Sequence, residues 1–141
     1  MRPRHFAAGL FAAVLLALAT FWWIWLSPFA YQPPSGLPPV AAGEQRLFVY
    51  GTLRHRLLRQ IVIGSHAPPR QAWLDGYRRE GLDIVVSPGE RVEGLLLTVD
   101  AGQLRRLDRY ERLGVRYDRY QVTLADGTSA WVYRRIVAAE R

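Results

Sequence analysis

The stretch that decides the fold is Leu47-Phe48-Val49-Tyr50-Gly51-Thr52-Leu53-Arg54, where an apolar strand runs directly into a turn. The branched and aromatic side chains before Gly51 favour a strand that is at least half buried. Gly51 gives the backbone the freedom to leave the strand. The N–H groups of Tyr50 to Leu53 then form a candidate nest for a carboxylate or an oxyanion, although an ordinary strand-to-loop turn uses the same residues.

Further motifs follow this loop along the chain. They are Asp75-Gly76-Tyr77, Arg91-Val92-Glu93-Gly94-Leu95-Leu96, Leu107-Asp108-Arg109-Tyr110-Glu111 and Tyr117-Asp118-Arg119. With the first loop, this series resembles the gamma-glutamylcyclotransferase-like family, including its AIG2-like and gamma-glutamylamine cyclotransferase branches, over residues 46–135. The resemblance implies a substrate-binding loop at Tyr50, Gly51, Thr52 and Leu53. It also implies an acid/base at Glu111, the glutamate of the L-D-x-x-E segment.

The resemblance also implies a reaction. In that family a γ-glutamyl group cyclises to 5-oxoproline and releases an amine or an amino acid, so we expect a small-molecule γ-glutamyl substrate and neither a cofactor nor a metal. The family usually has Gly after the catalytic Glu, whereas this chain has Arg112. The departure keeps an alternative open, a membrane-tethered binding or assembly module that retains the fold without turnover.

The environment of Glu111 follows from helical spacing. Residues 101–112 are predicted to form a helix capped by Asp100. On this helix Leu104, Leu107 and Glu111 lie within about 60° of one another, so burial of the leucines also buries the carboxylate. Desolvation should raise its pKa towards neutrality, as a general acid/base requires.

Other roles for the charged residues near Glu111 are possible. Glu111 could instead form an ion pair with Arg112, Arg116 or Arg119, or lie at a frayed helix end facing water. Asp108 lies nearer the polar edge of the helix, which favours a structural role. Tyr117 and Arg119 alternate on one strand face, and we expect them to line the substrate pocket, with cross-strand packing as the alternative.

The N-terminal segment is predicted to span a membrane. Phe6–Leu26 contains 21 uncharged residues and ends in a Trp-rich cluster, which matches the length and aromatic belt of a transmembrane helix. Arg2 and Arg4 precede it, so the positive-inside rule places the N-terminus in the cytoplasm and the domain on the periplasmic or extracytoplasmic side. A cleaved signal peptide is the alternative, although the apolar run is long for one.

Composition predicts three parts. These are an anchor with its cytoplasmic start (1–26), a Pro-rich linker acting as a semi-rigid spacer (27–45), and a gamma-glutamylcyclotransferase-like domain (46–141).

Cysteine is absent, which excludes thiolate catalysis and disulfides, and all 19 basic residues are arginine. The net charge is +7, but the arginines are scattered among acids and form no nucleic-acid motif, so we expect no nucleic-acid partner. Histidine spacing gives no metal site.

Short strand-like runs predict an α+β domain. They are Arg46–Tyr50, Gln71–Arg79, Leu82–Val86, Arg91–Val99, Tyr117–Leu124 and Ser129–Arg135. Turn residues at 87–90 and 125–128 separate two pairs of these runs. With helices near 54–63 and 101–112, we expect a small closed or nearly closed six-stranded barrel with two flanking helices, preceded by one transmembrane helix.

Overall fold

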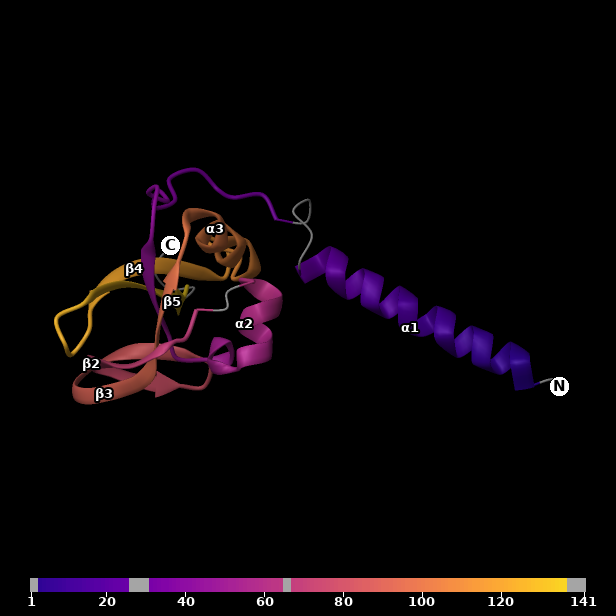
Figure 1. Ribbon diagram of the computed structural model, residues 1–141, viewed down its shortest axis with the longest axis horizontal. Coiled ribbons are helices and arrows are strands. Elements are labelled where there is room, and N and C mark those ends of the chain that lie inside the picture. Colours follow the sequence, from indigo (N-terminus) through magenta and orange to yellow (C-terminus); the bar gives the residue numbers. More distant parts are fainter. Residues whose placement is uncertain (1–2, 26–30, 65–66, 137–141) are drawn as a thin grey trace. The chain divides into compact units, whose positions relative to one another are not determined.

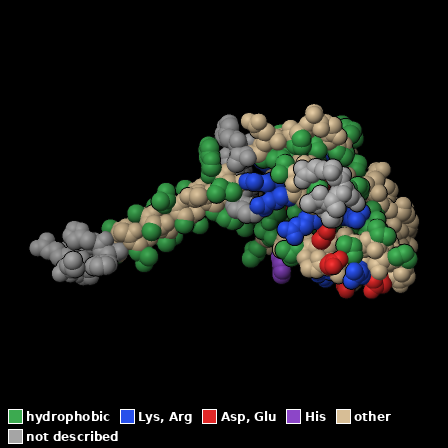
Figure 2. Space-filling view, turned by 180° about the vertical axis from the view of Figure 1, so that it is seen from behind, with side chains coloured by type: hydrophobic (Ala, Val, Ile, Leu, Met, Phe, Trp, Pro, Cys, Tyr) green, Lys and Arg blue, Asp and Glu red, His purple; other side chains and the backbone are tan. Residues whose placement is uncertain are grey.

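The computed structural model describes residues 3–25, 31–64 and 67–136. The chain divides into two compact units between Gln32 and Pro33. The first contains helix α1 (Pro3–Trp25), and Figure 2 shows hydrophobic side chains along its visible surface. Helix α1 is long and apolar enough to cross a membrane, a property that signal sequences and core helices of soluble proteins share.

The second unit is an α+β fold built on one curled sheet (Figure 1). Its strands are β1 (Gln45–Val49), β2 (Arg70–Glu80), β3 (Asp83–Val99), β4 (Tyr117–Thr123) and β5 (Ser129–Arg135). They lie in the order β2-β3-β1-β5-β4, and all neighbours are antiparallel except β1 and β5. Its helices are α2 (Arg56–Val62), α3 (Ala101–Tyr110) and the short 3-10 helix η1 (Thr52–Arg54).

The expected closed or nearly closed six-stranded barrel is wrong, because the described residues form a five-stranded half-barrel. The predicted strand Arg91–Val99, and the predicted strand Leu82–Val86 apart from Leu82, belong to the single long strand β3. Residues 87–90 lie between the pairs Tyr77↔Val86 and Asp75↔Arg91, so they form an irregular bulge in place of a turn. A bulge tolerates the missing N–H of Pro88, and the chain reverses earlier, between β2 and β3.

Alternation along β1 divides the core into two clusters. Leu47 and Val49 pack with leucines of α3 and with Val62 of α2. Phe48 and Tyr50 pack in a second cluster with residues of β2, β3 and β5. Both faces of β1 are therefore buried, which explains why its sequence is continuously apolar.

The half-barrel brings its two edges close together at one end. The N–H of Ala125, in the β4–β5 turn, donates to the carbonyl oxygen of Trp73 on β2 at 2.9 Å. Arg70 and Asp126 form an ion pair across the same gap, also at 2.9 Å. The predicted hairpin at 125–128 is confirmed, and its turn covers part of the exposed edge of β2.

Part of the predicted spacer packs against the domain. Leu37 and Val40 contact the core cluster that contains α3. The guanidinium of Arg119 donates to the carbonyl oxygen of Pro38 at 2.8 Å. Residues 33–40 therefore stabilise the domain in addition to leading into it.

We expect Gly114→Ala to destabilise the protein by about 2 kcal/mol, because Gly114 lies beneath this segment. Its φ is +77°, and an added Cβ would lie 2.6 Å from Pro34 Cγ and 2.7 Å from Leu37 Cδ2. Urea denaturation of the full chain measures the loss. Gly36→Ala is the matched control, since Gly36 has a similar φ of +84° but nothing within 4 Å. Equal losses in both variants would contradict the crowding at Gly114.

Candidate active site

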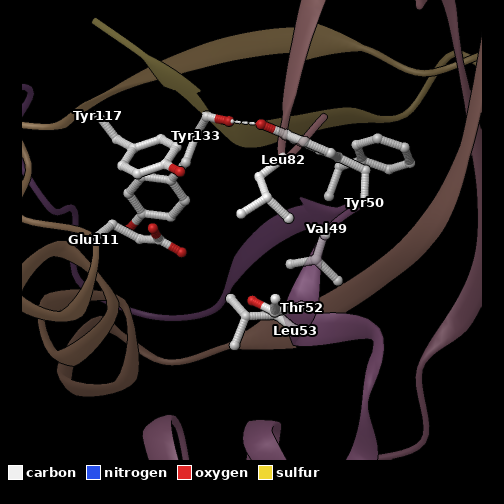
Figure 3. Close-up of a pocket in the computed structure, with 10 residues that line it drawn as sticks. Val49, Tyr50, Thr52, Leu53, Leu82, Glu111, Tyr117 and Tyr133 are labelled. Carbon is white, nitrogen blue, oxygen red and sulfur yellow. Dashed lines mark hydrogen bonds between the residues drawn. The ribbon is translucent and has the colours of Figure 1, made fainter. Parts of the chain in front are cut away.

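One pocket gathers most of the residues that the sequence singled out (Figure 3). Its cavity volume is small, about 70 Å³. Its lining residues are Phe48, Val49, Tyr50, Gly51, Thr52, Leu53, Leu82, Glu111, Tyr117 and Tyr133. The end of β1, the loop after it, the β2–β3 turn, the end of α3 and strands β4 and β5 thus meet around one cavity.

Helix α3 positions Glu111 at the pocket. Asp100 caps the helix and forms a capping box with Gln103, as the Asp100 prediction required. Leu104 and Leu107 are fully buried, which fixes the rotation of the helix. Glu111 follows the last helical residue, and its N–H donates to the carbonyl oxygen of Leu107 at 2.8 Å. The carboxylate therefore leaves the helix on its apolar face and points into the cavity (Figure 3).

Arg112 completes the end of α3 in a strained conformation. It is the one described non-glycine residue with a positive φ, +52°. Its N–H donates to the carbonyl oxygen of Arg109, and the N–H of Leu113 donates to that of Asp108, which is the Schellman pattern. Glycine is the residue that this position favours, and a side chain here costs about 1–2 kcal/mol. The protein thus keeps the helix ending that presents Glu111 despite the arginine.

Burial raises the pKa of Glu111 to about 7. None of the salt bridges between described residues includes its carboxylate. Arg119, one of the ion-pair partners considered for it, instead lies 3.2 Å from Asp108. A carboxyl group in this environment exchanges a proton near neutral pH, which is the property of a general acid/base.

The loop after β1 faces Glu111 from the other side of the pocket. Residues Thr52–Arg54 form η1, and the first N–H groups of such a turn have no partner within it. The buried guanidinium of Arg59 donates to the carbonyl oxygens of Leu53 and Arg54 and so holds the loop from behind. Burial raises the pKa of the Tyr110 hydroxyl on α3, and the neighbouring Thr52 side chain of the loop lowers it. The loop and the titratable carboxyl of Glu111 therefore line the same pocket.

Tyr133 is a pocket residue that sequence reasoning missed. Its hydroxyl donates to Asp108 Oδ1 at 2.6 Å, and its carbonyl oxygen accepts from the hydroxyl of Tyr50 at 2.6 Å. Burial and the Asp108 carboxylate raise the pKa of the Tyr133 hydroxyl. Phe48, Val49 and Leu82 were also missed as lining residues. The aromatic alternation of β5 was the only signal for Tyr133, and ordinary core strands share it.

Arg119 is not among the pocket-lining residues, unlike Tyr117 two positions earlier. Its side chain is buried, and its guanidinium lies 4.5 Å from the centre of the Trp131 ring and 3.2 Å from Asp108 Oδ1. Tyr117 and Arg119 therefore lie on the same face of β4, but only Tyr117 lines the cavity. The pairing also agrees with the structural role expected of Asp108.

The structure describes no metal site. Among the described residues, no group of three His, Asp or Glu side chains is placed to hold a metal ion.

The profile of the family described as gamma-glutamyl cyclotransferase, AIG2-like, matches residues 47–139. The chain belongs to this family. None of the curated proteins compared with the chain matches it.

Solved structures share the fold of this family member. An Arabidopsis thaliana protein is 25% identical with a TM-score of 0.57, and the match covers 66% of this chain and 69% of that one. A structure named gamma-glutamyl cyclotransferase is 17% identical with a TM-score of 0.55, covering 67% and 68%. An uncharacterized protein from Homo sapiens is 18% identical with a TM-score of 0.58, covering 67% and 68%. The chain thus spans about two thirds of the length of these structures.

Proposed function

We propose that the protein is a gamma-glutamylcyclotransferase-like enzyme that forms 5-oxoproline from a γ-glutamyl substrate and releases an amine or amino acid. The observation that carries the proposal is the half-buried Glu111 carboxyl, with a pKa of about 7, in a pocket that the Tyr50–Leu53 loop also lines. Family membership supports the same reaction class.

The proposed reaction needs one proton carrier. Glu111 takes a proton from the substrate's α-ammonium, and the free amine then attacks the γ-carbonyl carbon of the same molecule. A new C–N bond closes the five-membered ring, and the old C–N bond to the leaving group breaks. Glu111 returns this proton to the leaving nitrogen. It then relays the second proton, which the attacking nitrogen loses as the lactam forms, so that the amine departs as an ammonium ion and the carboxylate is regenerated without a cofactor.

The rest of the pocket would position the substrate. The N–H groups at Tyr50 to Leu53 would bind the glutamyl α-carboxylate or the developing oxyanion. Tyr117 forms part of the wall beside Glu111. Because nucleophile and electrophile belong to one molecule, the main task of the pocket is to hold the folded conformer in which they meet.

The test is release of 5-oxoproline by the purified full chain from a panel of γ-glutamyl amines and γ-glutamyl amino acids. Product from at least one of them is expected. Binding of these compounds without any 5-oxoproline would favour the alternative, a tethered module that keeps the fold without turnover.

We also propose that α1 anchors the protein in a membrane, with the domain on the periplasmic or extracytoplasmic side. The length and apolarity of α1 support the anchor, and Arg2 and Arg4, which precede the apolar run Phe6–Leu26, support the orientation. The test is a reporter enzyme that works only outside the cytoplasm, fused after Arg141. This fusion should show reporter activity. Activity of a cytoplasm-specific reporter would contradict the orientation, and a shortened chain found only in the soluble fraction would identify a signal peptide.

A further inference from the structure

A second groove adjoins the Glu111 pocket. It is lined by Gly51, Thr52, Arg54, His55, Arg79, Leu82 and Leu95. Gly51, Thr52 and Leu82 also line the first pocket, so the two share a wall. A substrate that fills the pocket and extends past this wall therefore enters the groove.

The groove is basic. Its lining contains two guanidinium groups and an imidazole but no carboxylate. Arg79 is exposed and donates to the carbonyl oxygen of Gly81 at 3.4 Å, and no salt bridge between described residues includes it. Arg54 lies 3.8 Å from Glu93, a long contact between two well-exposed side chains that is weak in water. Both cations can therefore receive an anion from a bound molecule.

We infer that the substrate's leaving group carries a carboxylate and that Arg54 and Arg79 bind it in this groove. The inference rests on the proposed function. With the glutamyl part folded against Glu111, the scissile C–N bond lies between the pocket and whatever part of the substrate extends beyond it. An amino acid leaving group has a carboxylate one carbon away from its nitrogen, whereas a simple amine offers the arginines nothing to bind.

The test compares γ-glutamylalanine with γ-glutamylethylamine, which differ by one carboxylate. We expect the full chain to prefer γ-glutamylalanine by about tenfold or more in kcat/KM, measured as 5-oxoproline release. Arg79→Gln should lower this preference by about tenfold, and Arg54→Gln should lower it in the same direction. Added salt should also lower it, because the cations are exposed.

Arg78→Gln is the matched control. Arg78 neighbours Arg79 on β2 but lies near Glu80 and Glu90, at 3.7 and 3.9 Å, and does not line the groove. The control should keep the wild-type preference. Equal kcat/KM for the two substrates in the wild type, or an unchanged preference in both arginine variants, would overturn the inference while the proposed function stands. Absence of 5-oxoproline from both substrates would overturn the inference and the proposed function together.

Discussion

Glu111→Gln is expected to lower turnover by at least about 10²-fold, the scale of a lost general acid/base. The amide is nearly isosteric with the carboxyl group but cannot accept the ammonium proton, so the fold should be preserved. Steady-state rates of 5-oxoproline release measure the effect. Glu44→Gln, the same change at an exposed position away from the pocket, is the control and should retain full activity. Undiminished turnover in Glu111→Gln would move the chemistry elsewhere, with Asp108 the first alternative.

The raised pKa of Glu111 predicts two pH dependences, one of kcat/KM and one of the free energy of unfolding, that a merely structural residue would not produce. Because the carboxylate form must accept the proton, wild-type kcat/KM should fall about tenfold per pH unit below about pH 7. The free energy of unfolding changes with pH in the opposite direction to kcat/KM. The folded state binds the proton more tightly than the unfolded state, so the free energy of unfolding falls as pH rises from about 4.5 to about 7.

Glu111→Gln removes that pH-dependent cost. At pH 8 the variant should therefore be more stable than the wild type, by up to about 3 kcal/mol. Urea denaturation at pH 5 and pH 8 checks the difference, which should shrink to about 1 kcal/mol at pH 5. A variant that loses activity and also loses stability at pH 8 would indicate a structural role for Glu111.

Local sequence signals were sufficient where the structure depends on neighbours along the chain. The Asp100 cap and the spacing of Leu104 and Leu107 predicted both α3 and the face that carries Glu111, and all are confirmed. The turn after β1 was likewise visible in the change from apolar residues to Gly51 and Thr52. Short-range periodicity and capping depend on contacts within one or two helical turns, so one sequence suffices to read them.

Local sequence patterns were insufficient where contacts with distant segments determine the structure. Ser87-Pro88-Gly89-Glu90 has the composition of a turn, yet pairing of β3 with β2 on both sides keeps the strand running through it. Pro34 and Leu37 read as spacer residues, but they cover Gly114 beside the end of α3. Arg119 shares a strand face with Tyr117, yet Asp108 and Trp131 bind it away from the pocket. Each outcome depends on a tertiary partner that local pattern does not encode.

Acylation of the substrate's α-amine is expected to abolish turnover, and this prediction separates cyclisation from ordinary amide hydrolysis. Only a free α-amine can attack the γ-carbonyl and close the ring, so an N-acetylated γ-glutamyl amine should yield no product even where it still binds. A hydrolase would accept it, because its nucleophile comes from water or from the protein.

Isotope labelling distinguishes the two mechanisms with the unblocked substrate as well. In water enriched in ¹⁸O, cyclisation yields 5-oxoproline whose ring carbonyl keeps the substrate's own oxygen, since water takes no part in the bond changes. Hydrolysis yields glutamate with one solvent oxygen in its γ-carboxylate. Mass spectrometry of the product therefore reports the nucleophile directly. Release of the amine from the N-acetylated compound, or labelled glutamate from the free one, would make the protein a hydrolase even with Glu111 shown to be essential.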